Sequence, residues 1–228
     1  MTAISKTPPV TAHYLFDFDG TIVDSMPYWA DTMLRVLDHH NVPYPENIIQ
    51  IITPLGLRAT AEHFITMGLE RTVDEILEEI ADHLTPHYCN VIPVKETVEQ
   101  TLRAMKAAGY GLHVLTASPH RWLDPCLRRL GLFDLFDNVW SSDDFGTTKT
   151  NPDIYIQAAR RMGTTVKNVT FLDDNVNADQ TAKRAGMYVI GVYDNSSQND
   201  ESIMREISDG YIHHFSELET LIQTMQQR

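Results

Sequence analysis

Short apolar runs and longer amphipathic stretches alternate along most of this 228-residue chain. The apolar runs predict buried strands, and the amphipathic stretches, most of them closed by a glycine, predict helices of about ten residues. We expect strands near 13–18, 111–115, 139–140, 169–172 and 188–192, and helices over 96–108, 121–130, 152–162 and 178–185. Such an alternation predicts an α/β fold with a doubly wound parallel sheet.

The segment between the first two strands follows a different pattern. From Ser25 onward apolar residues recur at helical spacing, with further helices expected over 57–67 and 73–83 and no convincing strand before position 91. This pattern predicts an all-helical cap domain of residues 24–91, inserted into a core domain formed by residues 1–23 and 92–228. In the tail after about residue 195 we expect packing segments, including a helix near 216–226.

Charge and composition limit the binding partners and the cellular compartment that we expect. The formal net charge of -13 disfavours nucleic acid and anionic membranes as partners. The polar stretch Met1–Val10 lacks the apolar core of a signal peptide, and Cys89 and Cys126 have no disulfide-scaffold spacing. We therefore expect a cytoplasmic protein with a loosely held N-terminal tail. The oligomeric state stays open, with a slight preference for a monomer.

Two aspartates follow the first apolar run directly. Residues two apart on a strand point to the same side, so Asp17 and Asp19 can converge where the strand ends. Two close carboxylates repel each other, which favours either protonation of one or a divalent cation between them. Gly20 allows a tight turn that can present amide N–H groups to an anion. A plain Asx-rich turn is the alternative interpretation of these residues.

The segment Asp17–Thr21, followed by Asp24 and Ser25, resembles the first motif of the haloacid dehalogenase-like (HAD) hydrolases. The resemblance implies that Asp17 is a nucleophile that accepts a phosphoryl group. It also implies that Asp19 is a general acid and base. The presence of Asp19 favours phosphate ester chemistry, because dehalogenases of this family lack that second acid.

Three later segments resemble the remaining motifs of the family, in the expected order. Thr116 ends an apolar strand as in the second motif, and Lys149 precedes a Pro-Asp helix start as in the third, although Thr150 stands where relatives commonly have proline. Asp173 and Asp174 close a strand as in the fourth motif. Since the carboxyl ends of parallel strands share one edge of the sheet, we expect these groups to meet there.

The resemblance assigns further roles. It implies an Mg²⁺ site made chiefly by Asp17, the Asp19 carbonyl and Asp174, with Asp173 secondary. Phosphate-binding groups are expected at Phe18, Gly20, Ala117 and Ser118, together with the Thr116 hydroxyl and the Lys149 ammonium. In the expected cap, Arg58 is a candidate for substrate contact. Asp143 and Asp144 are expected to be surface residues or supports of the metal site, and Asp179 is an acid that relatives do not commonly carry.

These observations predict an Mg²⁺-dependent phosphatase that hydrolyses a small-molecule phosphate monoester through an aspartyl-phosphate intermediate. A phosphomutase of the β-phosphoglucomutase type is the nearest alternative. It is disfavoured because Trp29 stands near the position at which those mutases usually carry a histidine. An alternative of another class is a phospho-Asp signalling module, which would form a stable phosphoprotein without turnover.

Overall fold

The computed structural model describes residues 12–226. The expected tail at Met1–Val10 lies outside the described residues. The chain divides into two compact units, one built from the segments up to Asp24 and from Pro93 onward, the other from Ser25–Ile92. We call them the sheet unit and the helical unit.

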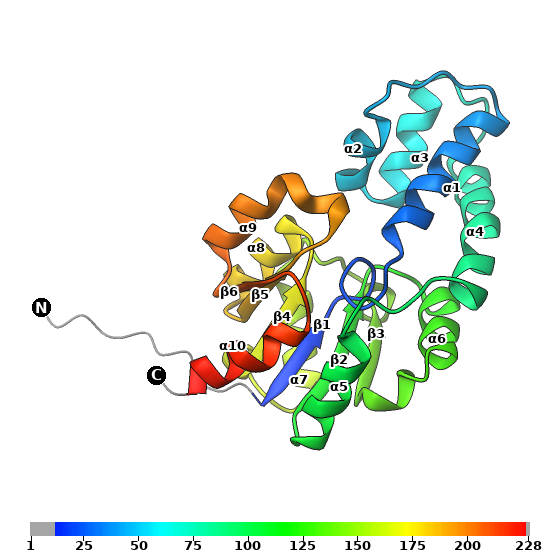
Figure 1. The fold of residues 1–228 in the computed structure, drawn as a ribbon. Coiled ribbons are helices and arrows are strands. Elements are labelled where there is room, and N and C mark those ends of the chain that lie inside the picture. Colours follow the sequence, from blue (N-terminus) through cyan, green and yellow to red (C-terminus); the bar gives the residue numbers. More distant parts are fainter. Residues whose placement is uncertain (1–11, 227–228) are drawn as a thin grey trace, which may run out of the picture. The chain divides into compact units, whose positions relative to one another are not determined.

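A six-stranded, all-parallel sheet forms the centre of the sheet unit, in the order β3-β2-β1-β4-β5-β6 (Figure 1). The chain runs outward from β1 in one direction through β2 and β3, then returns to the other side of β1 with β4. Ligand sites in such sheets lie outside the carboxyl ends of the strands where the order reverses. The strands are β1 (His13–Phe16), β2 (Gly111–Thr116), β3 (Asn138–Ser141), β4 (Val169–Asp173), β5 (Tyr188–Val192) and β6 (Gly210–Ile212).

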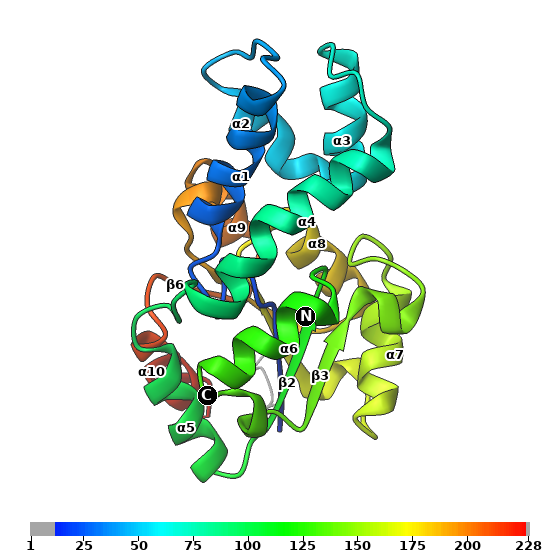
Figure 2. The ribbon, with the colours of Figure 1, turned by 90° about the vertical axis from the view of Figure 1, so that its right-hand side faces the viewer.

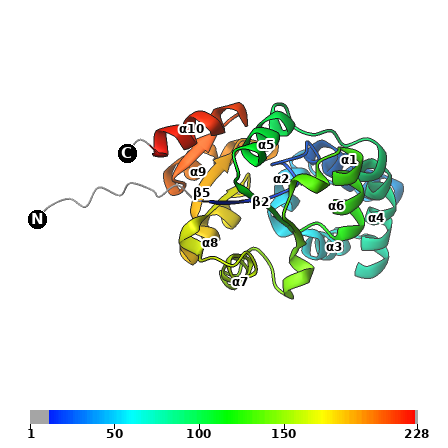
Figure 3. The same ribbon diagram turned by 90° about the horizontal axis from the view of Figure 1, so that it is seen from below.

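Helices cover both faces of this sheet, as the doubly wound prediction requires. Figure 3 shows α5 and α10 on one face and α7 and α8 on the other. Because both faces are covered, the central strands are mostly apolar and almost wholly buried. The helices of the sheet unit are α5 (Val98–Ala107), α6 (His120–Arg129), α7 (Asp153–Arg161), α8 (Val176–Ala185), α9 (Glu201–Ile207) and α10 (Ser216–Gln226).

The helical unit contains no strand within its described residues, and α1, α3 and α4 pack together in it (Figure 2). Its helices are α1 (Met26–His39), α2 (Ile48–Ile52), α3 (Leu57–Thr66) and α4 (Val73–Asn90). A capping box begins α4: the hydroxyl of Thr72 accepts from the Glu75 amide, and the Glu75 carboxylate accepts from the Thr72 amide. That this unit acts as a cap stays a prediction.

Helix α4 and the tail differ from the sequence-based expectations. Helix α4 continues through Pro86 to Asn90 instead of ending near 83, because Leu84 and Tyr88 extend its buried face. The tail contributes a sixth strand, β6, which pairs with β5, and a helix, α9, that the apolar pattern did not indicate. None of the helices described between residues 12 and 226 is long and apolar enough to cross a membrane.

Candidate active site at the carboxyl ends of β1 and β4

Strand register places the first aspartate beside the acidic pair. Phe16 on β1 is paired with Leu172 on β4, and the Asp17 amide donates to the Leu172 carbonyl over 2.8 Å. Asp17 therefore lies next to Asp173, which ends β4. Both side chains are buried, as is that of Asp174. The structure thus brings Asp17 together with two carboxylates that lie more than 150 positions later in the sequence.

Lys149 supplies the positive charge in this cluster. Its ammonium nitrogen lies 2.6 Å from Oδ1 of Asp17 and 2.7 Å from Oδ2 of Asp173. Burial alone lowers the pKa of Lys149, but the two carboxylates outweigh burial and raise that pKa well above its ordinary value. Lys149 is therefore a fixed cation throughout the physiological pH range.

Local hydrogen bonds hold the Lys149 backbone, although Thr150 follows this lysine in place of the expected proline. The Tyr155 hydroxyl donates to the Lys149 carbonyl over 3.1 Å. The hydroxyls of Thr148 and Thr150 lie 2.8 Å apart, and the Asn151 amide donates to the Thr148 carbonyl. These bonds fix the loop shape, so Thr150 does not prevent Lys149 from reaching the cluster.

The two acids at the end of β4 are held in different ways. Asp173 accepts from Lys149 on Oδ2 and from the Asn175 amide on Oδ1, at 2.7 Å each. Asp174 accepts from the Thr21 hydroxyl at 3.0 Å. Burial raises the pKa of Asp173 to about 7, and burial together with the negative charge of its neighbours raises that of Asp174 well above the ordinary range. The carboxylate of Asp174 thus accepts fewer of these hydrogen bonds than that of Asp173, which leaves more of its oxygen lone pairs for a metal ion.

Gly20 is required by a close approach. It has a φ of +75°, and a Cβ on this residue would lie only 2.5 Å from Oδ2 of Asp174. Its amide donates to the Val23 carbonyl over 3.0 Å, and that this amide binds an anion stays a prediction. The turn uses the donor internally, and the role of Gly20 is to leave room for Asp174.

Lys95 is a structural support of this turn that sequence reasoning missed. Its ammonium donates to the Gly20 carbonyl at 2.6 Å, to the Tyr193 carbonyl at 2.8 Å and to Oδ2 of Asp194 at 2.9 Å. It therefore ties the turn after β1 to the end of β5. No periodicity or motif marks this lysine, because its partners are 75 to 99 positions away.

Asp19 and the end of β2 are joined by a hydrogen bond. The Ser118 hydroxyl donates to Oδ2 of Asp19 over 2.5 Å, and Thr116 accepts from the Ser118 amide on its own hydroxyl oxygen at 3.0 Å. Ala117 is exposed, whereas the Phe18 side chain is completely buried, so that only its backbone can face a ligand. Ser118 thus fixes the orientation of the half-buried Asp19 carboxylate.

The donor set fits a small divalent cation. Ligand oxygens of Asp17, Asp173 and Asp174 all lie within 4.8 Å of one another. Three buried carboxylates face one ammonium, and the raised pKa values of Asp173 and Asp174 record this excess of negative charge. Carboxylate oxygens in such a cluster are the ligands that Mg²⁺ prefers. No thiolate or imidazole belongs to this group among the described residues.

The remaining candidate residues are not among these three ligands. Arg58 is in the helical unit, where it forms an exposed ion pair with Asp74 at 3.2 Å. Asp144 accepts from the Ser141 amide and pairs with His120, so its role is to cap a short helix, while Asp143 is exposed. Asp179 is fully buried in the first turn of α8, and burial raises its pKa well above the ordinary value.

Comparison with known proteins identifies the family. The family model of the haloacid dehalogenase-like hydrolases matches residues 11–186. The chain therefore belongs to the haloacid dehalogenase-like hydrolases, and the predicted family and α/β fold are confirmed. It is a hydrolase with phosphatases among its relatives.

Two curated relatives illustrate that similarity. A phosphoglycolate phosphatase of Psychrobacter arcticus is 26% identical, over 78% of this chain and 81% of its own. A validoxylamine A 7'-phosphate phosphatase of Streptomyces hygroscopicus is 25% identical, over 78% of this chain and 84% of its own. Among solved structures, CbbY from Rhodobacter sphaeroides in complex with xylulose-(1,5)-bisphosphate has the same fold. Its TM-score is 0.78 at 20% identity, with 91% of this chain and 96% of that chain covered.

Proposed function

We propose that this protein is an Mg²⁺-dependent phosphatase that hydrolyses a small-molecule phosphate monoester through a phosphoryl group on Asp17. The observation that carries the proposal is the contact between Lys149 and Asp17 within the acidic cluster at the ends of β1 and β4. Phosphoryl transfer needs an in-line nucleophile and fixed positive charge around the transferred group, and this cluster offers both.

In the first step, an Asp17 carboxylate oxygen attacks the phosphorus atom and the bond from phosphorus to the ester oxygen breaks. Asp19 donates its proton to the departing alkoxide, which leaves as an alcohol. The Lys149 ammonium offsets the repulsion between the Asp17 carboxylate and the incoming phosphate dianion. Asp17 and Asp174, with the Asp19 carbonyl and secondarily Asp173, would hold Mg²⁺. When bound, this ion neutralises charge on the phosphate oxygens.

In the second step, Asp19, now a carboxylate, removes a proton from a water molecule that attacks the phosphorus atom. The acyl phosphate bond breaks, inorganic phosphate leaves and the Asp17 carboxylate is regenerated. The Ser118 hydroxyl keeps the Asp19 carboxylate oriented for both proton transfers. The same residue thus serves as acid and then as base.

The substrate class follows from the relatives and the helical unit. The curated relatives are named for phosphatases of phosphoglycolate and of a 7'-phosphate of validoxylamine A, both small organic phosphates. We propose that residues 24–91 act as a cap that selects among such substrates, with Arg58 as a candidate contact.

At Trp29 the indole N–H donates to the Tyr88 hydroxyl at 2.7 Å. An indole cannot shuttle protons, which favours a phosphatase over a mutase.

Turnover of p-nitrophenyl phosphate with and without Mg²⁺ tests the proposal. Catalytic release of phosphate in the presence of Mg²⁺ supports a phosphatase. A stable phosphoprotein without turnover contradicts it and favours a signalling module, and transfer of phosphate between sugar positions without hydrolysis favours a mutase. A panel of phosphoglycolate, sugar phosphates and nucleotides then defines the substrate.

A further inference from the structure

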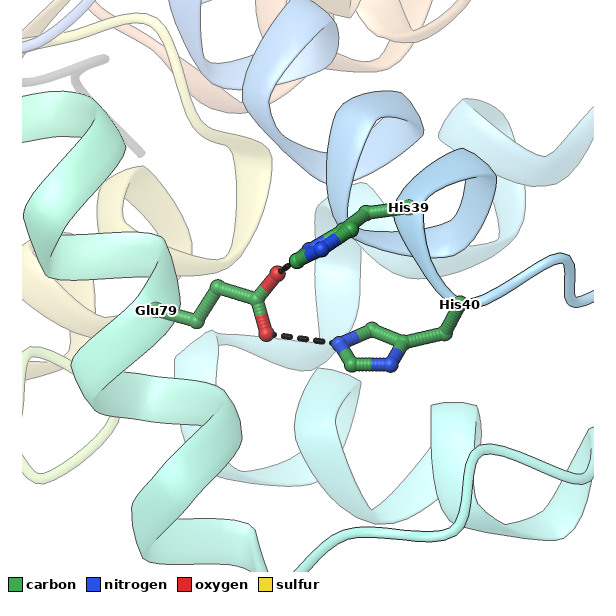
Figure 4. Close-up of side chains that lie close together, drawn as sticks. All are labelled: His39, His40 and Glu79. Carbon is green, nitrogen blue, oxygen red and sulfur yellow. Dashed lines mark hydrogen bonds and ion pairs between the residues drawn. The ribbon is translucent and has the colours of Figure 1, made fainter.

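The helical unit contains a second group of potential metal ligands, His39, His40 and Glu79 (Figure 4). Both histidine rings point toward the same carboxylate. Nδ1 of His39 lies 2.7 Å from Oε1 of Glu79, and Nε2 of His40 lies 2.8 Å from Oε2. One ligand atom from each of the three residues lies within 4.8 Å of the others.

The backbone at the end of α1 fixes the two histidines. Asn41 has a left-handed φ of 53°, its amide donates to the Asp38 carbonyl, and the Val42 amide donates to the Leu37 carbonyl. These two bonds form a Schellman motif, which closes the helix in a defined geometry. His39 is the last residue of α1 and His40 follows it, with their ring centroids 4.7 Å apart. The two imidazole rings therefore lie next to each other at the end of α1.

Glu79 comes from a well-anchored part of α4, because its neighbours Ile76 and Ile80 are completely buried. The rings of His39 and His40 hold its carboxylate in place through contacts of 2.7 and 2.8 Å. The carbonyl groups at the end of α1 also favour a cation at this place.

We propose that His39, His40 and Glu79 bind one Zn²⁺ ion that holds the end of α1 to α4. Two imidazole nitrogens and one carboxylate oxygen, with a fourth position left for water, form a known zinc ligand set. Imidazole suits zinc far better than it suits Mg²⁺, so this site differs in metal preference from the acidic cluster of the sheet unit. The proposal does not depend on the proposed phosphatase activity.

Coordination of one ion requires the side chains to move, because the two histidines contact different oxygens of Glu79. Tetrahedral coordination with bonds of about 2.0 Å places ligand atoms roughly 3.3 Å apart. The two contacts of 2.7 and 2.8 Å must therefore open by about half an ångström. The side chain of His39 is 68% exposed, whereas those of His40 and Glu79 are only 17% and 19% exposed. Solvent, and thus the metal, reaches the site from the side of His39.

Titration of the full-length protein with Co²⁺ and then Zn²⁺, in excess Mg²⁺, tests the proposal. Co²⁺ in a tetrahedral site with two imidazoles gives an intense visible band, whereas Co²⁺ bound by oxygens alone in octahedral geometry gives a weak one. We expect the intense band at one ion per chain, its loss on addition of one equivalent of Zn²⁺, and a higher Tm with Zn²⁺ bound.

Substitutions test whether these three residues bind the metal ion. His40→Gln and Glu79→Gln should each weaken Zn²⁺ binding at least about 10-fold, the lower limit seen even when a partner of a metal ligand is removed. His63→Gln, on α3 in the same unit, is the matched control and should bind as the unchanged protein does. If His40→Gln fails to fold, as judged by circular dichroism, His39→Gln replaces it. Absence of the intense band, or equal Zn²⁺ affinity in all the variants, would show that the three residues form only a hydrogen-bonded contact.

Discussion

The Lys149 ammonium lies 2.6 Å from the carboxylate of Asp17 and 2.7 Å from that of Asp173. These contacts join the loop before α7 to the ends of β1 and β4. Because all three side chains are largely withheld from solvent, their interaction is weakly screened. Lys149 therefore has two tasks, to allow acidic groups to be buried together and to reduce the repulsion that a phosphate dianion meets.

Replacement of Lys149 by methionine keeps the length of the side chain and removes its charge. We expect kcat to fall by about 10²–10³, in line with the loss of one preorganised electrostatic group. The same change at the exposed Lys167 is the control and should leave kcat unaltered. Steady-state kinetics on folded protein measure both, and equal kcat values for the two variants would remove Lys149 from the mechanism.

Asp19→Ala tests the proton transfers. Loss of a general acid and base costs about 10²–10⁴ in rate, so hydrolysis of every substrate should slow by this amount. Formation of the phosphoenzyme should slow strongly with alkyl phosphates, whose alkoxides need a proton, and only weakly with p-nitrophenyl phosphate. Rapid-quench measurements separate the two steps. If both steps retain normal rates with all substrates, Asp19 has a structural role only.

Metal dependence distinguishes the two acids at the end of β4. Both oxygens of Asp173 are already bonded, to Lys149 and to the Asn175 amide, whereas Asp174 accepts one bond from Thr21. Asp174→Ala should therefore raise the Mg²⁺ concentration needed for activity more than Asp173→Ala does. Chelation should abolish turnover reversibly, and Ca²⁺ should substitute poorly. Full activity in excess chelator, or the reverse ranking, would contradict the proposed metal site.

A buried histidine on β2, three residues before Thr116, predicts how stability changes with pH. Burial, helped by His13, lowers the pKa of His113 from 6.5 to about 4. Between these values the unfolded chain binds a proton that the folded chain does not, so this group destabilises the fold as the pH falls. The full effect is about 3 kcal/mol below pH 4.

His113→Gln should remove this contribution, and the free energy of unfolding should then fall less between pH 7 and about 4 than in the unchanged protein. Urea unfolding at several pH values measures the difference between the two slopes. Identical slopes would mean that His113 is protonated in the folded state. The absolute stability is not the readout, because the substitution also changes the contacts of His113 with His13 and Asn138.

The strands of the sheet were predictable where they are buried on both faces. Tyr188–Val192 and Val169–Asp173 are short, mostly apolar runs, and the structure has strands where the pattern predicts them. Strand β6 was not predictable in this way. It has only three residues, begins with Gly210 and pairs with the edge of β5. Helix α4 passes Pro86 because tertiary packing of its apolar face outweighs the lost hydrogen bond.

The residues of the site likewise divide into those that the sequence predicted and those that it did not. Motifs at the ends of β1 and β4 and before α7 predicted Asp17, Asp174 and Lys149 as site residues. The structure brings Asp17 and Asp174 into one acidic cluster, with Lys149 2.6 Å from Asp17. Lys95 was not found, because its importance rests on three partners distant in sequence. The pairing of His39 and His40 with Glu79 was not foreseen either, since 40 positions separate the two helical faces that meet there.

A phosphoryl group on Asp17 is the most direct sign of the proposed reaction. Asp19→Ala protein, in which hydrolysis of the intermediate is slow, is mixed with p-nitrophenyl phosphate and Mg²⁺ and then reduced with borohydride. Hydride attacks the acyl phosphate, phosphate leaves and the side chain becomes a primary alcohol, which peptide mass spectrometry locates. We predict reduction at position 17 alone, and none after Asp17→Asn in the same background. Catalytic turnover in the unchanged protein without reduction at Asp17, or with reduction at another acid, would contradict the proposed mechanism.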